Sequence, residues 1–146
     1  MGAITSFGAL TQHAWIKSGL CFMGVPQFGQ FANEMFRKAE QSGMKISEQE
    51  KESLLNQIKP YDLAKRPDKL NERPLFMWHG KDDSTIPFTF AQQFIAGIEQ
   101  WKSSQFNKIT FLPEEGAGHK VSRKAMLEAA NWLPTVMTES KHGMFS

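Results

Sequence analysis

Short apolar segments that alternate with amphipathic segments constrain the fold of this chain most. The apolar segments end at glycine, proline or polar residues, as buried strands do, and they lie within residues 15–23, 74–78 and 108–112. Segments with the spacing of amphipathic helices lie at residues 3–12, 27–42, 87–101 and 122–133. In the last of these we expect Met126, Ala129, Ala130 and Leu133 to be buried, and we expect a loose tail beyond Pro134. Strands that alternate with helices predict a parallel sheet covered on both faces. We therefore predict an α/β chain with about three parallel strands and flanking helices.

The long segment between the first two strands, residues 24–73, is predicted to be a helical insertion in a single domain that spans residues 1–146. Gly43 is suited to end its first helix. Ser47 and Glu50 have the spacing of a capping box, which predicts the start of a second helix. Residues 61–73 are polar and contain proline, so we expect a loop or single turns there.

One face of the first inserted helix is strongly apolar. Phe28, Phe31, Met35 and Phe36 are spaced i, i+3, i+7 and i+8, which places them on one side of a helix. This face has two interpretations. It is either the buried face of the helix or, for Phe28, Phe31 and Met35, the wall of an apolar substrate pocket.

Composition excludes several classes of function. The formal net charge is +2 and the basic residues are scattered, so neither nucleic acid nor an anionic membrane is an expected partner. The single cysteine, Cys21, permits no internal disulfide, and the four histidines do not have zinc-ligand spacing. No apolar run is long enough to span a bilayer. We expect a cytoplasmic protein without a metal ion or organic cofactor.

Two loops that follow consecutive strands carry residues suited to acid–base chemistry. Asp83 lies in the loop after the second strand, and His119 lies in a glycine-rich loop after the third. The carboxyl ends of parallel strands meet at one edge of a sheet, where ligands bind. A carboxylate bonded to one ring nitrogen of a histidine fixes its tautomer and stabilises its imidazolium form. We therefore predict that Asp83 orients His119, which acts as a general base. Taken alone, Asp83 also suits a helix N-cap.

The two loops resemble those of α/β-hydrolases. His79-Gly80-Lys81-Asp82-Asp83-Ser84-Thr85-Ile86-Pro87 is similar to the acid loop of that family, and Gly116-Ala117-Gly118-His119 is similar to its histidine loop. The resemblance implies that Asp83 is the acid and His119 the catalytic histidine, in the family order of nucleophile, acid and histidine. It also implies that His79 is a loop histidine without a catalytic role, and that the insertion at 24–73 is a lid.

The first residues of the chain resemble the end of a nucleophile elbow. Met1-Gly2 followed by small residues is similar to the last two residues of Gly-x-Ser-x-Gly and the helix after it. This resemblance places the serine just before Met1 and makes the Met1 nitrogen an oxyanion-hole position. Ser6 is a poorer candidate for the nucleophile, because Ile4 stands where a glycine belongs and a serine inside a helix does not project as an elbow does.

The resemblance therefore implies the C-terminal part of a serine hydrolase of the esterase or prolyl-oligopeptidase-like kind. An intact version would act on a small ester, thioester or peptide-like substrate, whereas the chain alone is expected to be inactive. The alternatives are a non-catalytic binding or regulatory module and a subunit that complements a separate chain. Three strands without neighbours leave an open edge, so we also expect self-association or a partner chain that supplies the missing strands.

Overall fold

The computed structural model describes residues 2–70, 73–100 and 108–142 of the chain. Its strands are β1 (Gly19–Phe22), β2 (Leu75–Gly80) and β3 (Ile109–Glu114). Its helices are α1 (Gly2–Gln12), α2 (Phe28–Gln41), α3 (Glu48–Ile58), α4 (Phe88–Gln100) and α5 (Arg123–His142). Three short 3₁₀ turns follow α3, namely η1 (Lys59–Tyr61), η2 (Leu63–Lys65) and η3 (Pro67–Leu70). The predicted alternation of helices and strands is confirmed.

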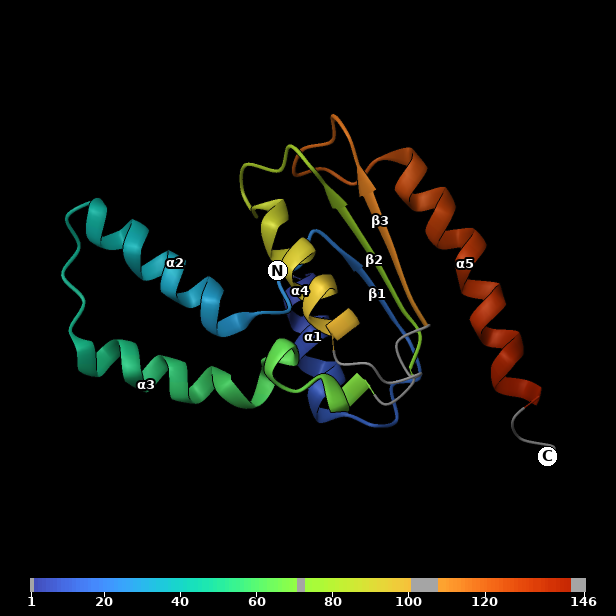
Figure 1. Ribbon diagram of the computed structural model, residues 1–146, viewed down its shortest axis with the longest axis horizontal. Coiled ribbons are helices and arrows are strands. Elements are labelled where there is room, and N and C mark those ends of the chain that lie inside the picture. The colour runs from blue at the N-terminus through green and yellow to red at the C-terminus, as the bar shows by residue number, and fades with distance from the viewer. Residues whose placement is uncertain (1, 71–72, 101–107, 143–146) are drawn as a thin grey trace.

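The strands of the described residues form one parallel sheet in the order β1-β2-β3. Their carboxyl ends lie together at the upper edge of the sheet in Figure 1. Strands β2 and β3 are longer than expected, because His79 pairs with Pro113 and Gly80 pairs with Glu114 at their ends. The first residues of both predicted loops therefore belong to the sheet. The strand pairing extends to the residues that come just before the candidate site.

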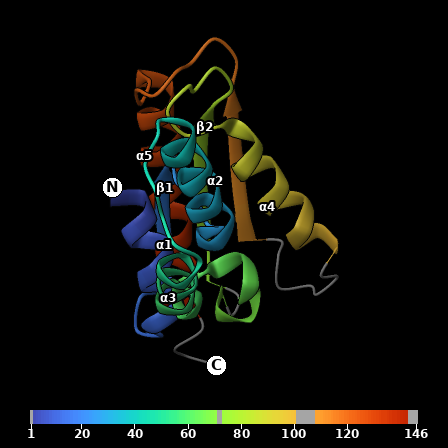
Figure 2. The same ribbon diagram turned by 90° about the vertical axis from the view of Figure 1, so that its left-hand side faces the viewer.

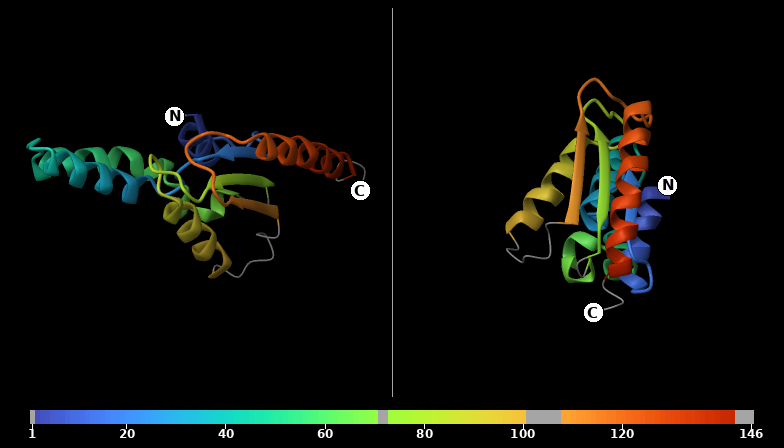
Figure 3. Two further views of the ribbon diagram at one scale, coloured as in Figure 1. Left: turned by 90° about the horizontal axis from the view of Figure 1, so that it is seen from above. Right: turned by 90° about the vertical axis from the view of Figure 1, so that its right-hand side faces the viewer.

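Helices cover both faces of this sheet. On one face, Cys21 and Met77 pack with Phe7 of α1 and Phe94 of α4. On the other face, the strand side chains pack against α5, with Phe76 and Trp78 from β2 and Ala125 and Ala129 from α5. Figure 3 (right) shows α4 and α5 on opposite sides of the strands. This layering leaves the carboxyl edge of the sheet free to carry a site.

The predicted buried face of α5 is confirmed at Ala129 and wrong at Met126, Ala130 and Leu133. We expected Met126, Ala129, Ala130 and Leu133 to be buried, but Met126 is 56% exposed and Leu133 is 36% exposed. The helix instead turns Ala125, Ala129 and Trp132 inward. The ring of Trp132 lies 5.7 Å from that of Phe76, and small alanines let the helix approach the sheet.

The end of α5 also differs from expectation. A loose tail was expected beyond Pro134, but the helix continues through Pro134 to His142. Proline removes one hydrogen bond to the carbonyl of the residue four positions earlier, which is Ala130. Both residues are exposed, so water can satisfy that carbonyl and the helix can continue.

Helices α2 and α3 form a pair that projects from the body of the molecule (Figure 1; Figure 3, left), and Figure 2 views this pair from its outer end. Gly43 has a positive φ of 92°, which ends α2 as predicted. The capping box at Ser47 and Glu50 starts α3, also as predicted. Lys51 of α3 lies 2.6 Å from Glu40 of α2. Helix α3 buries none of its residues and α2 buries only Ala32, so the pair adds little to the core.

Candidate active site

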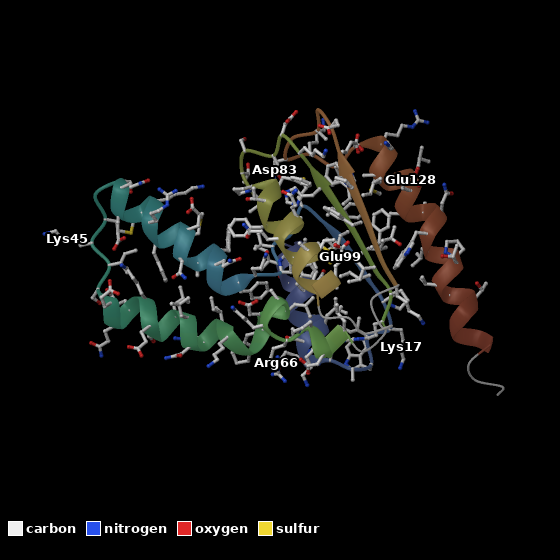
Figure 4. The ribbon with its side chains drawn as sticks, in the orientation of Figure 1. Lys17, Lys45, Arg66, Asp83, Glu99 and Glu128 are labelled. Atoms are coloured by element: carbon white, nitrogen blue, oxygen red, sulfur yellow. The ribbon has the colours of Figure 1, made fainter. Side chains whose placement is uncertain are left out.

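Asp83 lies at the carboxyl edge of the sheet, in the loop between β2 and α4 (Figure 4). Its side chain is fully buried. Carboxylate oxygen Oδ1 accepts hydrogen bonds from the backbone N–H groups of Thr85, at 2.9 Å, and Ile86, at 2.8 Å. The loop therefore folds back on the carboxylate and fixes its orientation.

The second carboxylate oxygen of Asp83 contacts His119. Oδ2 lies 2.8 Å from Nδ1 of His119, which follows β3. A carboxylate only accepts hydrogen bonds, so Nδ1 carries the proton and donates a hydrogen bond to Oδ2. In a neutral ring this leaves Nε2 as the nitrogen that can accept a proton. The His119 side chain is 41% exposed, so its ring can be reached from solvent.

The pKa of Asp83 lies below its ordinary value. Burial on its own raises the pKa, but hydrogen bonds from Ile86, His119 and Thr85 outweigh this effect and favour the ionised form. Asp83 is therefore a carboxylate at neutral pH, as stabilisation of a charged histidine requires.

The loops that carry Asp83 and His119 are joined by backbone hydrogen bonds. The N–H of Lys81 donates to the carbonyl of Glu114, and the N–H of Asp82 donates to that of Ala117 at 3.0 Å. The contact is so close that a Cβ at Gly80 would lie 2.2 Å from the Ala117 carbonyl oxygen. Gly80 is therefore needed where the loops cross.

Glu114 and Ser122 support the histidine loop, and sequence reasoning did not select them. The Glu114 carboxylate accepts hydrogen bonds from Trp78 Nε1 and from the hydroxyl of Ser122, both at 2.7 Å. The Ser122 hydroxyl also accepts a bond from the N–H of Ala125, which caps α5. The bonds from Ser122 and Trp78 lower the pKa of Glu114. A serine at the first position of the predicted helix was the available signal for this support.

A cavity of about 620 Å³ lies beside His119. Its wall combines the start of α1, the end of β1, the acid loop and α2, represented by Ala3, Met23, Ile86 and Phe31. Of the predicted pocket residues, Phe31 lines this cavity. Phe28 lines a different hollow between α1 and Tyr61, and half-buried Met35 is not part of the cavity wall beside His119. The predicted oxyanion position, Met1, lies outside the described residues.

Among the residues that the structure describes, Ser6 and Cys21 carry nucleophilic side chains, and neither is suited to attack a substrate. Ser6 lines the cavity, but it lies within α1 and its hydroxyl donates to the carbonyl of Gly2 at 2.9 Å. Cys21 lies in β1, and burial raises the pKa of its thiol to about 12, which keeps it protonated.

Among the residues that the structure describes, no cluster of three or more histidine, cysteine, aspartate or glutamate side chains is placed to hold a metal ion. Within the same residues, no helix is both long and apolar enough to cross a membrane.

The sheet order, its helical layers and the pair at its carboxyl edge define part of an α/β-hydrolase fold. Solved structures share this fold. TT1662 from Thermus thermophilus matches with a TM-score of 0.66 and 16% identity over 92% of this chain and 50% of its own. Acyl-protein thioesterase 2 from Zea mays matches with a TM-score of 0.58 and 16% identity over 93% of this chain and 52% of its own.

A sequence relative gives a more particular comparison. The chain is 34% identical over 139 residues to the protein named "Putative esterase YitV" of Bacillus subtilis. These residues are 94% of this chain. The match covers 54% of YitV, so the chain spans about half the length of this relative. No family model matches the sequence.

Proposed function

We propose that this chain supplies the acid and the general base of a serine hydrolase. The observation that carries this proposal is the hydrogen bond of 2.8 Å between Asp83 and His119 beside an open cavity. The relative named as an esterase and the neighbour named as a thioesterase support hydrolysis of an acyl group. The substrate class is an ester, a thioester or a peptide-like amide.

In the proposed reaction a serine hydroxyl attacks the carbonyl carbon of the substrate. Nε2 of His119 takes the hydroxyl proton and then donates it to the leaving group. Asp83 holds the ring through Nδ1 and stabilises its charged form. Water then attacks the acyl-enzyme in the same way, with His119 again as the base. This sequence needs no metal ion or cofactor.

We further propose that the nucleophile comes from a segment outside residues 1–146. The start of α1 supports this, because Gly2 and Ala3 line the cavity beside His119, where a residue preceding the helix would reach the base. The match to half of YitV leaves room for such a segment. In this proposal the peptide N–H of Met1 is an oxyanion donor, and the 146-residue chain alone does not form an acyl-enzyme.

The insertion at residues 24–73 is proposed to act as a lid over the cavity. Phe31 of α2 supports this role, since its ring lies on the cavity wall and 5.9 Å from the ring of Phe90. Because it projects from the body (Figure 3, left), the rest of the α2–α3 pair has room to change its angle.

The free edge of β1 is a place where a further strand can pair, from a partner chain or from a second copy of this chain. Within the described residues β1 pairs with β2 on one side alone, so its other edge offers unpaired backbone groups. A segment of the hydrolase that precedes this chain, or a second copy of the chain, would cover that edge.

A fluorophosphonate probe tests the proposed function, since it labels activated serines. The chain extended by the residues encoded upstream should be labelled at a serine ahead of α1, and His119→Ala should abolish labelling. The 146-residue chain should not be labelled. Labelling of the 146-residue chain at Ser6 would refute the proposed source of the nucleophile. An extended chain that neither reacts with the probe nor hydrolyses p-nitrophenyl esters would refute the hydrolase proposal.

A further inference from the structure

His79 is a buried titratable side chain that the proposed reaction does not use. It lies near the end of β2, four residues before Asp83, and is 1% exposed. The ring of Phe88 packs against it at 5.9 Å. A histidine is an unusual choice for such a position unless its ring nitrogens have partners.

The Nε2 atom of His79 has two partners in the acid loop. It lies 2.8 Å from the carbonyl oxygen of Ile86 and 3.5 Å from Oδ2 of Asp83. A carbonyl oxygen only accepts hydrogen bonds, so Nε2 carries a proton and donates a hydrogen bond to the carbonyl oxygen of Ile86. This bond connects the strand to the far end of the acid loop.

Ile86 is bonded to both His79 and Asp83. Its N–H donates to Oδ1 of Asp83 at 2.8 Å, and its carbonyl accepts the bond from His79. The His79 bond therefore holds in place a residue that orients the carboxylate. Loss of the bond would free the loop to rotate and would leave the Ile86 carbonyl without this partner in a buried place.

The charge state of His79 also suits this position. Burial lowers the pKa of His79, although the Ile86 bond and the Asp83 charge oppose the effect and His119 adds to it. A neutral His79 directs an N–H dipole at Oδ2 of Asp83 without adding a second positive charge. A charged ring there would compete with His119 for the carboxylate and would repel its imidazolium form.

We propose that His79 is a positioning residue that holds the acid loop so that Oδ2 of Asp83 faces Nδ1 of His119. This inference rests on the proposed function for its meaning in catalysis. The geometry that it explains exists in the 146-residue chain and can be measured without a nucleophile.

Two amide variants test the inference on the 146-residue chain. The amide N–H of His79→Gln can occupy the place of Nε2 and donate to Ile86, whereas the shorter side chain of His79→Asn cannot reach it. The measurements are the NMR resonance of the Nδ1 proton of His119 and the rate at which that proton exchanges with solvent. We expect the wild type and His79→Gln to retain a slowly exchanging Nδ1 proton. In His79→Asn this signal should broaden and the proton should exchange faster, because the carboxylate of Asp83 turns away from Nδ1.

An apolar variant and a distant histidine complete the experiment. His79→Phe keeps the ring volume without the donor, so it should behave as His79→Asn does. His13→Gln, at an exposed site between α1 and β1, should change neither signal. The inference is overturned if His79→Asn or His79→Phe keeps the wild-type Nδ1 signal, or if His79→Gln loses it as His79→Asn does.

Activity of the upstream-extended chain separates the inference from the proposed function. There we expect His79→Asn to lower kcat about tenfold with little change in KM, and His79→Gln to restore most of it. If the extended chain is inactive while the NMR results are as expected, the proposed function fails and the positioning of Asp83 by His79 stands.

Discussion

At the scale of single residues, hydrogen-bond donors surround the carboxylate of Asp83 and favour its charged form. Because burial is outweighed by hydrogen bonds from Ile86, His119 and Thr85, the folded-state pKa of Asp83 lies below its ordinary value of 3.8. The stabilisation from these bonds is therefore fully present above about pH 4, and it is lost as the pH falls through the lower folded-state pKa.

Asp83→Asn tests this pH dependence. The variant should be less stable than the wild type at pH 7, and the difference should shrink as the pH falls below 4, because the wild-type carboxylate then takes up a proton. Urea unfolding between pH 7 and pH 3 measures the difference. Asp68→Asn, at an exposed site, should show no such trend. A constant difference for Asp83→Asn across this range would contradict the assignment.

Gly80 is the residue at which the acid and histidine loops cross. Gly80→Ala would bring a Cβ to 2.2 Å from the Ala117 carbonyl oxygen, so the histidine loop must shift. We expect a loss of about 1–3 kcal/mol in the free energy of unfolding, measured by urea denaturation. Gly118→Ala is the matched control on the other side of the crossing, in the histidine loop, because a Cβ there has its nearest neighbour at 3.8 Å. Equal effects of the two variants would show that crowding at Gly80 is not the cause.

At the scale of elements, one arginine joins the end of α1 to the segment before β2. The guanidinium of Arg73 donates to the carbonyls of His13, at 2.9 Å, and Ile16, at 3.0 Å, and also to that of Leu10. These bonds satisfy carbonyls at and after the end of α1. Helix α1 is thereby fixed at the end opposite to the one that lines the cavity.

Arg73→Met should therefore destabilise the fold although the site is distant. Methionine keeps much of the apolar stem but removes the donors, so we expect a loss of about 2–3 kcal/mol in urea unfolding. The exposed pair Arg37–Glu34 in α2 provides the control, and Arg37→Met should cause no resolvable change. If Arg73→Met unfolds at the same urea concentration as the wild type, these bonds do not stabilise α1.

At the scale of the whole molecule, apolar side chains on the outer side of α5 are exposed to solvent, because no described segment packs over them. Met126, Leu127 and Met137 on the outer side of α5 are each more than half exposed. The free edge of β1 belongs to the same sheet. Exposed apolar patches next to an unpaired strand favour association.

The 146-residue chain is therefore expected to self-associate as its concentration rises. A variant with Met126→Lys, Leu127→Lys and Met137→Lys should associate less, as measured by sedimentation velocity at several concentrations. Met44→Lys changes an equally exposed methionine in the turn between α2 and α3, and should leave association unchanged. A wild-type chain that sediments as a monomer at every concentration would refute the proposed partner or self-association.

Local patterns in the sequence were enough to predict the order of strands and helices, the capping box at Ser47, the stop at Gly43 and the loops of Asp83 and His119. These features depend on residues close together in the chain, whose spacing and conformational preferences act before any long-range contact forms. The parallel sheet followed from their order.

The tertiary structure decided how distant side chains meet. The pairing of Asp83 with His119 was expected from the order of their loops, but the bond of 2.8 Å across 36 positions and the crossing at Gly80 depend on the register of β2 with β3. The buried face of α5 was predicted incorrectly because its rotation is set by Phe76 and Trp132, on separate elements. The positions of Phe28 and Met35 away from the His119 cavity likewise depend on how α2 meets the sheet. Such contacts depend on packing between distant segments, which the spacing of residues along the chain does not determine.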